Sequence, residues 1–173
     1  MTKEVKVVID TNILINASAD ESSYAFRIVK EVIEGRIEAF ATHQMMSENR
    51  QMLRKLVKDR KYKELLENFF TRLKIVKIHN SPPPSLILRE GAPPLRVRGG
   101  WEELLSDKDD LKLFESALVA KADYIISEDK EVLAVENYAG TEAITPKDFW
   151  TKYQGEKDGD SEWRDFSRMI LGK

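Results

Sequence analysis

Short apolar runs of β character alternate with segments of helical periodicity along most of this chain. Apolar residues recur at helical spacing in residues 23–34, 43–58 and 60–72. The β-like runs are Lys6–Ile9, Ile37–Ala41, Ile75–Ile78, Asp123–Ser127 and Glu142–Ile144. A chain in which strands alternate with helices favours an α/β fold built around a mostly parallel sheet.

Composition limits the class of protein. The 173 residues are 42% hydrophobic, which is enough to build the core of a single domain. The chain has no cysteine, no secretory signal and no apolar run long enough to span a bilayer, so we expect a cytoplasmic protein without a membrane partner. The net charge of -2 excludes no partner, because nucleic-acid binding depends on where cations cluster.

The first apolar run contains three polar residues, in the sequence VVIDTNILI of residues 7–15. An unpaired carboxylate is costly to bury, so Asp10 requires a compensating partner, access to water or a metal ion. Alternatively, Asp10 ends a strand and caps the helix that follows it.

Two further acids are expected on helix faces that are otherwise apolar. On the predicted helix 43–58, Glu48 falls about 60° from the centre of an apolar stripe formed by Met45, Met52 and Leu56, so we expect Glu48 to border the core. The segment SDKDDLKLFESALVAKADY, residues 106–124, has its predicted buried stripe at Phe114, Ala117 and Leu118. Asp110 lies on that stripe, Asp109 lies about 100° away from it, and Lys112 and Glu115 lie opposite.

Asp129 repeats the pattern of Asp10, because the strand-like run 124–126 leads through Ser127 to this aspartate. Ligands of open parallel sheets bind outside the carboxyl ends of the strands. We therefore expect Asp10 and Asp129 to project into one crevice, with Glu48 and Asp110 on flanking helices.

Four converging carboxylates would repel one another unless a cation neutralised them, and hard oxygen ligands select Mg²⁺ or Mn²⁺. A divalent metal site explains the pattern economically. Zinc is disfavoured, because the chain has two histidines and no cysteine. The alternative is that each acid is a helix cap or a solvated charge.

These motifs resemble the PIN domain ribonucleases, and in particular their toxin-component branch. The resemblance rests on VVIDTNILI, on Glu48 followed by Leu53, and on DKDDLKLFESALVAKADYIISEDKEVL with its S-x-D ending. It covers residues 5–79 and 107–148. It implies a three-layer α/β/α fold with a mostly parallel sheet of about five strands, and a PIN-like nuclease domain over residues 1–150.

By this resemblance the protein is expected to be a metal-dependent endonuclease that cleaves single-stranded RNA, with an antitoxin protein as partner. Asp10, Glu48, Asp110 and Asp129 would be the catalytic, metal-binding acids, with Asn12 and Ser127 orienting them. Mg²⁺ or Mn²⁺, as one ion or two, would lower the pKa of the attacking water.

Cations are needed to hold the phosphates of such a substrate. The candidates follow Glu48 along its helix or lie in residues 80–106: Arg50, Arg54, Lys58, Arg89, Arg96 and Arg98. The alternative for each of them is a solvated surface charge.

Two segments interrupt the α/β rhythm. Residues 80–106 contain five of the six prolines and are expected to form an inserted hairpin or flap from residues 86–89 and 95–98. This insertion would shape the RNA path or mediate subunit contacts. Residues 151–173 are expected to form a polar linker and an amphipathic C-terminal tail helix with Trp163, Phe166 and Ile170, which would pack on its own domain, on a homodimer partner or on an antitoxin.

Two competing functions remain. A haloacid-dehalogenase-like phosphatase also begins with an aspartate at a strand end, but that family needs a second aspartate where this chain has Asn12. A PIN-like scaffold that binds RNA or protein without cutting would explain the fold, although retention of all four acids argues against it.

Overall fold

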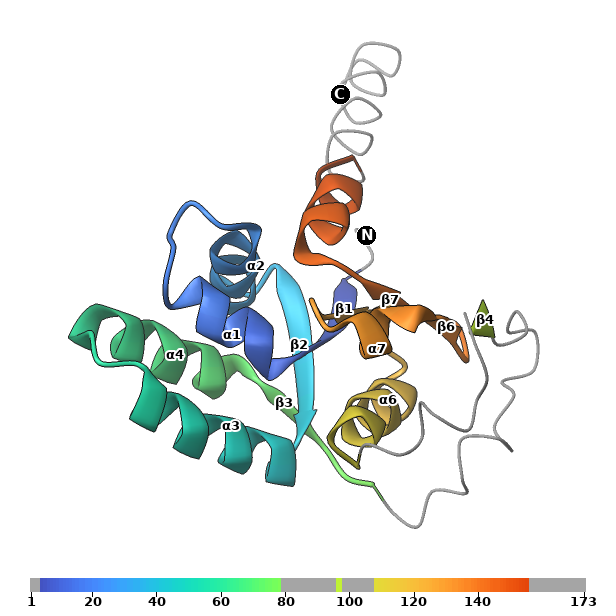
Figure 1. The fold of residues 1–173 in the computed structure, drawn as a ribbon, viewed down its shortest axis with the longest axis horizontal. Coiled ribbons are helices and arrows are strands. Elements are labelled where there is room, and N and C mark those ends of the chain that lie inside the picture. Colours follow the sequence, from blue (N-terminus) through green and yellow to red (C-terminus); the bar gives the residue numbers. More distant parts are fainter. Residues whose placement is uncertain (1–3, 79–95, 98–107, 156–173) are drawn as a thin grey trace, which may run out of the picture.

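A seven-stranded sheet forms the centre of the molecule (Figure 1). The computed structural model describes residues 4–78, 96–97 and 108–155, with 96–97 and 108–110 described by their backbone. The strand order is β3-β2-β1-β5-β7-β6-β4. The strands are β1 (Val5–Ile9), β2 (Ile37–Thr42), β3 (Lys74–Val76), β4 (Arg96–Val97), β5 (Tyr124–Ile126), β6 (Val135–Tyr138) and β7 (Thr141–Ile144).

The first five strands in that order are β3, β2, β1, β5 and β7. They are all parallel, which confirms the predicted sheet and the positions of its five strands. Strand β6, which lies between β7 and β4, pairs antiparallel with β7 and was missed by sequence patterning. It is joined to β7 by Ala139 and Gly140, which both have positive φ, at 50° and 90°. A two-residue turn of this kind is usually signalled by Asn-Gly or Asp-Gly, so an alanine at its first position concealed the hairpin.

Helices cover both faces of the sheet, which confirms the three-layer arrangement (Figure 1). The helices are α1 (Thr11–Ala17), α2 (Tyr24–Ile33), α3 (His43–Leu56), α4 (Arg60–Arg72), α6 (Lys108–Ala120), α7 (Lys130–Ala134) and a helix over residues 146–155. One core cluster joins the sheet to α1, α2, α4 and the helix 146–155. The other joins it to α6 and α7. Alternation within β1 divides the two clusters, since Val7 and Ile9 face the first and Val8 faces the second.

The predicted apolar stripe of α3 is partly wrong. Met45 is buried as expected, but Met52 and Leu56 are 43% and 55% exposed, and Leu53 is the buried residue of the second half. The reason is that Met45 packs in the cluster beneath α6 whereas Leu53 packs in the cluster of α2 and α4, so the buried face of α3 changes along its length.

The helix 146–155 belongs to the domain. Phe149 and Tyr153 are buried in the first core cluster, and their rings stack with centroids 5.7 Å apart. Tyr153 Oη donates a 2.7 Å hydrogen bond to Glu31 of α2. Residues 151–155, predicted as the start of a linker, therefore continue this helix, and the predicted tail residues Trp163, Phe166 and Ile170 lie outside the described residues.

The predicted insertion lies mostly outside the described residues. Within it, Arg96–Val97 forms β4, which pairs antiparallel with β6. Its predicted hairpin partner, residues 86–89, and Arg98 are not among the described residues. Over the described part of the chain, no helix is both long and apolar enough to cross a membrane.

Candidate active site

The order of the strands creates one switch point in the sheet, between β1 and β5. From β1 the chain proceeds outward through β2 to β3, whereas β5 and β7 lie on the other side of β1. Asp10 directly follows β1, and Ser127 to Asp129 directly follow β5. In α/β sheets a ligand crevice opens at this kind of position, so the topology brings two of the four predicted acids to it.

A hydrogen-bond network joins the two strand ends. The hydroxyl of Ser127 donates to Asp10 Oδ2 over 2.6 Å, and Asn12 Nδ2 donates to the same oxygen over 2.8 Å. The Asp129 backbone N–H in turn donates to Ser127 Oγ over 3.0 Å. Asn12 and Ser127 thus contact Asp10 directly, and Ser127 connects it to the backbone of Asp129.

The pKa of the Asp10 carboxyl is raised above its ordinary value. Burial is the main cause, because it removes water from the charged form, and the negative charge of Asp129 raises the pKa further. The hydrogen bond from Ser127 and the backbone of Thr11 act in the opposite direction but do not cancel these effects. The ionised Asp10 is therefore held at a free-energy cost that a nearby cation would relieve.

Asp129 has a capping role as well. It is the N-cap of α7, where its Oδ1 accepts a 2.8 Å hydrogen bond from the Glu131 N–H, and its side chain is exposed. Asp10 also occupies an N-cap position, that of α1, but its side chain makes no capping hydrogen bond. Capping therefore explains one contact of Asp129, but it does not explain the half-buried carboxylate of Asp10.

Glu48 lies on α3 and is exposed, so the expectation that it borders the core is wrong. Its carboxylate accepts from Gln44 over 2.9 Å and pairs with Lys112 of α6 over 3.0 Å. Its neighbour Asn49 accepts a 2.6 Å hydrogen bond from Thr11, the residue after Asp10. The backbone of α3 next to Glu48 is therefore held beside the β1–α1 junction, while the carboxylate itself contacts a lysine.

Lys112 was assigned to the outward side of α6, and that assignment is wrong. Its side chain is 23% exposed and faces Glu48. The buried residues of α6 are Leu113, Phe114, Ser116, Ala117 and Ala120, whereas Leu118 is half-buried. The burial of Leu113 and Ser116, on the side away from Leu118, rotates the helix relative to the predicted stripe and turns Lys112 toward α3.

Asp110 lies in the first turn of α6, where only the backbone is described. Among the side chains that are described, no three acidic or histidine residues come together as a metal-ligand set. The structure thus brings Asp10 and Asp129 together and joins Glu48 to Lys112, and Asp110 remains a prediction.

The predicted RNA-binding cations differ in their surroundings. Arg50 and Arg54 both pair with Glu67 of α4, and Arg50 also lies over the ring of Phe70 at 5.6 Å from its centroid. Lys58, in the connection between α3 and α4, is exposed. Arg96 is described by its backbone, and Arg89 and Arg98 lie outside the described residues.

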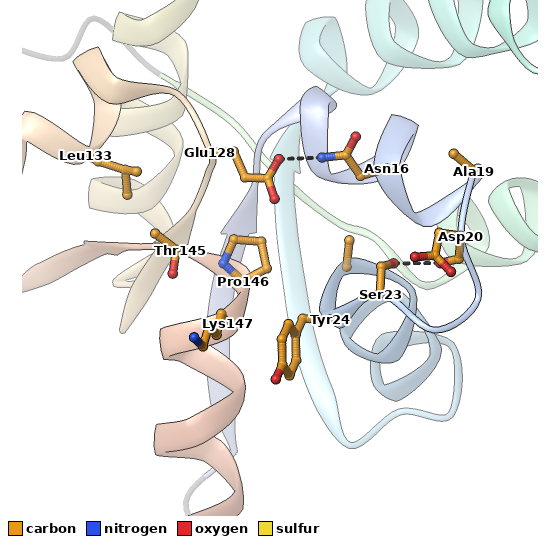
Figure 2. A pocket seen from close by; sticks show the side chains of 11 residues that line it. Asn16, Ala19, Asp20, Ser23, Tyr24, Glu128, Leu133, Thr145, Pro146 and Lys147 are labelled. Carbon is orange, nitrogen blue, oxygen red and sulfur yellow. Dashed lines mark hydrogen bonds between the residues drawn. The ribbon is translucent and has the colours of Figure 1, made fainter.

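A pocket of about 470 Å³ lies next to the strand ends, and sequence analysis did not find it (Figure 2). Its walls come from α1, the α1–α2 connection, the start of α2, Glu128, Leu133 of α7 and the residues that follow β7. The sequence signal for this pocket was the polar residues that follow β5 and β7. That signal was too weak to identify it, because no motif distinguishes Glu128 from an ordinary surface acid.

The fold is that of an α/β protein in which Ser127 joins Asp10 to the Asp129 backbone at the switch point of the sheet. Residues 6–131 match the family model described as PIN domain, which is more than half of the chain. The chain belongs to the PIN domain family.

Comparison with solved structures gives the same fold. The chain is similar to a crystal structure of VapBC2 from Rickettsia felis bound to a DNA fragment from the promoter, with a TM-score of 0.50 and 12% sequence identity. The alignment covers 82% of this chain and 98% of that one. At this identity the similarity shows the fold alone. No curated protein matches the chain.

Proposed function

We propose that this protein is a metal-dependent endoribonuclease that cleaves phosphodiester bonds of single-stranded RNA. Asp10, Glu48, Asp110 and Asp129 are the proposed metal-binding acids, and Asn12 and Ser127 orient Asp10. The observation that carries the proposal is the linkage of Asp10 to Ser127 and Asp129 across the switch point, in a chain of the PIN domain family.

The chemistry of the donors fits a hard divalent cation. Asp10 and Asp129 offer carboxylate oxygens, and Asn12 Oδ1 is buried with no hydrogen-bond partner among the described residues. Oxygen donors of this kind suit Mg²⁺ or Mn²⁺, and the raised pKa of Asp10 is consistent with a site that becomes more stable when a cation binds. Bound Mg²⁺ or Mn²⁺ would supply Lewis acidity that lowers the pKa of a water molecule and neutralises charge on the phosphodiester.

The chain's own residues perform the positioning. Two hydrogen bonds to Oδ2 fix the plane of the Asp10 carboxylate, and the same serine accepts from the backbone of Asp129. Because these bonds connect two neighbouring strands, the relative placement of Asp10 and Asp129 is set by the sheet rather than by a flexible loop.

The biological setting that we propose is a toxin–antitoxin pair, with this chain as the toxin and an antitoxin protein as its partner. The resemblance of the motifs to the toxin-component branch supports it, and the fold shared with VapBC2 is consistent with it.

One observation favours a second candidate, a PIN-like scaffold that binds RNA or protein without cleaving it. The Glu48 carboxylate, a proposed metal ligand, is paired with Lys112. The lysine ammonium therefore occupies a carboxylate that the nuclease would need for its metal ion. A scaffold would keep this ion pair permanently, whereas a nuclease must open it when the metal ion binds.

A metal titration combined with RNA cleavage separates these candidates. The purified protein is mixed with a labelled single-stranded RNA and increasing Mn²⁺ or Mg²⁺, with Asp10→Asn protein and excess EDTA as controls. Metal-dependent fragments that are absent with Asp10→Asn support the nuclease. RNA binding without fragments at any metal concentration would establish the scaffold.

A further inference from the structure

The pocket beside the strand ends is close enough to the proposed active site to contact the same RNA strand. Glu128 lines it, and Glu128 lies in the chain between Ser127, which bonds to Asp10, and Asp129. Asn16 of α1, which also lines the pocket, donates a hydrogen bond to the Glu128 carboxylate and so holds this side chain (Figure 2). A nucleotide adjoining the cleaved phosphodiester would therefore enter the pocket without leaving the crevice.

The charges that line the pocket favour the base of a nucleotide over its phosphate group. Asp20 and Glu128 are acidic, and Lys147 is the one basic residue among the lining residues, all of which are described. A phosphate group would meet repulsion from both carboxylates. A base with N–H donors on its edge would instead gain hydrogen bonds to carboxylate oxygens, which are stronger than those to neutral acceptors.

The pocket also offers an aromatic surface. Tyr24 lines it and is 39% exposed, more than the other large aromatic residues that the structure describes. Arg27 lies 5.5 Å from the centroid of Tyr24 and 6.0 Å from that of Trp150, so the tyrosine is held in place by a cation–π contact. Exposed, held aromatic rings are the surfaces on which unpaired bases stack.

We propose that this pocket binds an unpaired guanine base of the RNA strand, stacked on Tyr24 and hydrogen-bonded at its Watson–Crick edge by Glu128. Guanine has two adjacent donors on that edge, N1–H and the N2 amino group, which match the two oxygens of a carboxylate. Adenine and cytosine have an acceptor beside their amino group, and uracil has one N–H between two carbonyls. The volume of about 470 Å³ lies in the range of pockets that hold small organic ligands.

The inference rests on the proposed function, because that function supplies single-stranded RNA as the ligand. The test therefore measures binding without cleavage. Asp10→Asn protein in EDTA is titrated with a fluorescent octamer of uridines that contains one guanosine, and the dissociation constant comes from anisotropy. A matched octamer carries inosine, which lacks the N2 amino group, and a third carries 2′-deoxyguanosine.

We expect the guanosine octamer to bind about tenfold more tightly than the inosine octamer, and 2′-deoxyguanosine to bind like guanosine. Adding Glu128→Gln should remove most of the difference between guanosine and inosine. Glu131→Gln, which removes the same charge from an exposed residue outside the pocket, should preserve it. Equal binding of guanosine and inosine, or a loss caused by the deoxy sugar alone, would overturn the proposal.

Tyr24 provides a second measurement. Tyr24→Ala should weaken binding of the guanosine octamer about tenfold or more, whereas Tyr24→Phe keeps the ring and should bind like the parent. No change with Tyr24→Ala would contradict a stacked base. If guanosine-dependent binding is found but the wild-type protein never cleaves RNA, the pocket assignment stands and the proposed nuclease function fails.

Discussion

The Ser127 hydroxyl donates a 2.6 Å hydrogen bond to the Asp10 carboxylate, and this bond connects residues that are 117 positions apart in the chain. It is made possible by the parallel pairing of β1 with β5, which aligns Ile9 with Ile126 and so brings the residues after them together. The bond stabilises the ionised form of Asp10, yet the pKa of Asp10 is still raised, because burial and the charge of Asp129 outweigh it. The site therefore carries an unfavourable negative charge that the fold tolerates.

Asp10→Asn should abolish metal-dependent RNA cleavage. The amide keeps the size of the side chain but removes the half-buried charge that would attract the cation. We expect a loss of about 100-fold or more, the order found when one essential electrostatic group is removed from an active site. Cleavage of a labelled RNA with Mn²⁺ measures it, and wild-type activity in this variant would disprove the assignment of Asp10.

The same variant should unfold at a higher temperature than the wild type at neutral pH. Since the pKa of Asp10 is raised by folding, the ionised carboxylate destabilises the folded state above that pKa. As the pH falls through the raised pKa the wild type takes up a proton and gains stability, so the difference from Asp10→Asn should shrink in acid. Thermal melts between pH 4 and 7 test this.

Asp59→Asn is the matched control for that experiment. Asp59 caps α4 by accepting from the Lys61 N–H, and asparagine caps a helix equally well. The control should therefore change the melting temperature little at any pH. A stabilisation of the control equal to that of Asp10→Asn would show that the effect does not come from the active site.

Much of the fold could be predicted from the sequence, because its signals are local. Arg60–Arg72 is helical over the predicted range, and β1 to β3, β5 and β7 lie where β-branched runs occur. The placement of Asp10 and Asp129 at the same edge of the sheet was also predictable, since both follow apolar strands and parallel strands end at the same edge. Asn12 and Ser127 lie beside Asp10 as expected, although their roles in catalysis remain predictions.

The errors come from contacts between helices, which sequence periodicity does not define. Met52 was counted as buried because it is apolar, yet its position on α3 faces solvent. Lys112 was placed outward because it lies opposite the predicted stripe of α6, yet it pairs with Glu48. In both cases the rotation of a helix about its axis depends on which neighbours it packs against, and a hydrophobicity pattern fixes that rotation only coarsely.

Asp110→Asn should abolish cleavage, whereas Asp109→Asn should reduce it much less. Both residues lie in the first turn of α6, about 100° apart around the helix, and the motif resemblance assigns the metal-binding role to Asp110. The two variants are compared in the same Mn²⁺-dependent cleavage assay. Equal losses would show that the assignment of Asp110 rather than Asp109 by resemblance is not supported.

Lys112→Met should tighten Mn²⁺ binding by about three- to tenfold. The ammonium lies 3.0 Å from Glu48, so its removal makes the proposed site more negative by one charge, and interactions between exposed charges are worth up to about 1 kcal/mol. Electron paramagnetic resonance of free Mn²⁺ measures the affinity. Lys30→Met, on α2 and exposed, should leave the affinity unchanged. Weaker Mn²⁺ binding in Lys112→Met would contradict competition between Lys112 and the cation.

Tyr153→Phe should lower the free energy of unfolding by about 1.5 to 3 kcal/mol, the range for a buried hydrogen bond to a charged group. Its hydroxyl donates to Glu31, which is buried and also accepts from Arg36. Urea unfolding measures the change. Tyr138→Phe is the control, because the Tyr138 hydroxyl is buried without a hydrogen-bond partner among the described residues, and its loss should be neutral or stabilising. Equal destabilisation by both variants would mean that the bond to Glu31 contributes nothing specific.

Lys58 and Arg50 should differ in their contribution to RNA binding. Lys58 is exposed, so Lys58→Ala should lower the slope of log K against log salt by roughly 0.7, the value for one contact to a single-strand phosphate. Arg50 is paired with Glu67 and lies over Phe70, so a phosphate contact would have to break an existing ion pair. Arg50→Ala should therefore change the salt dependence less, and instead lower the free energy of unfolding by up to about 1 kcal/mol, as expected for a partly exposed ion pair.

Anisotropy titrations of a single-stranded RNA at several salt concentrations, with Asp10→Asn protein as the uncleaving parent, measure both slopes. Lys63→Ala, on the exposed side of α4, controls for the loss of one positive charge from the chain as a whole. A larger change of slope in Arg50→Ala than in Lys58→Ala would show that Arg50 leaves Glu67 to bind the phosphate backbone. The α3–α4 ion pair would then be a contact that RNA opens rather than a fixed part of the fold.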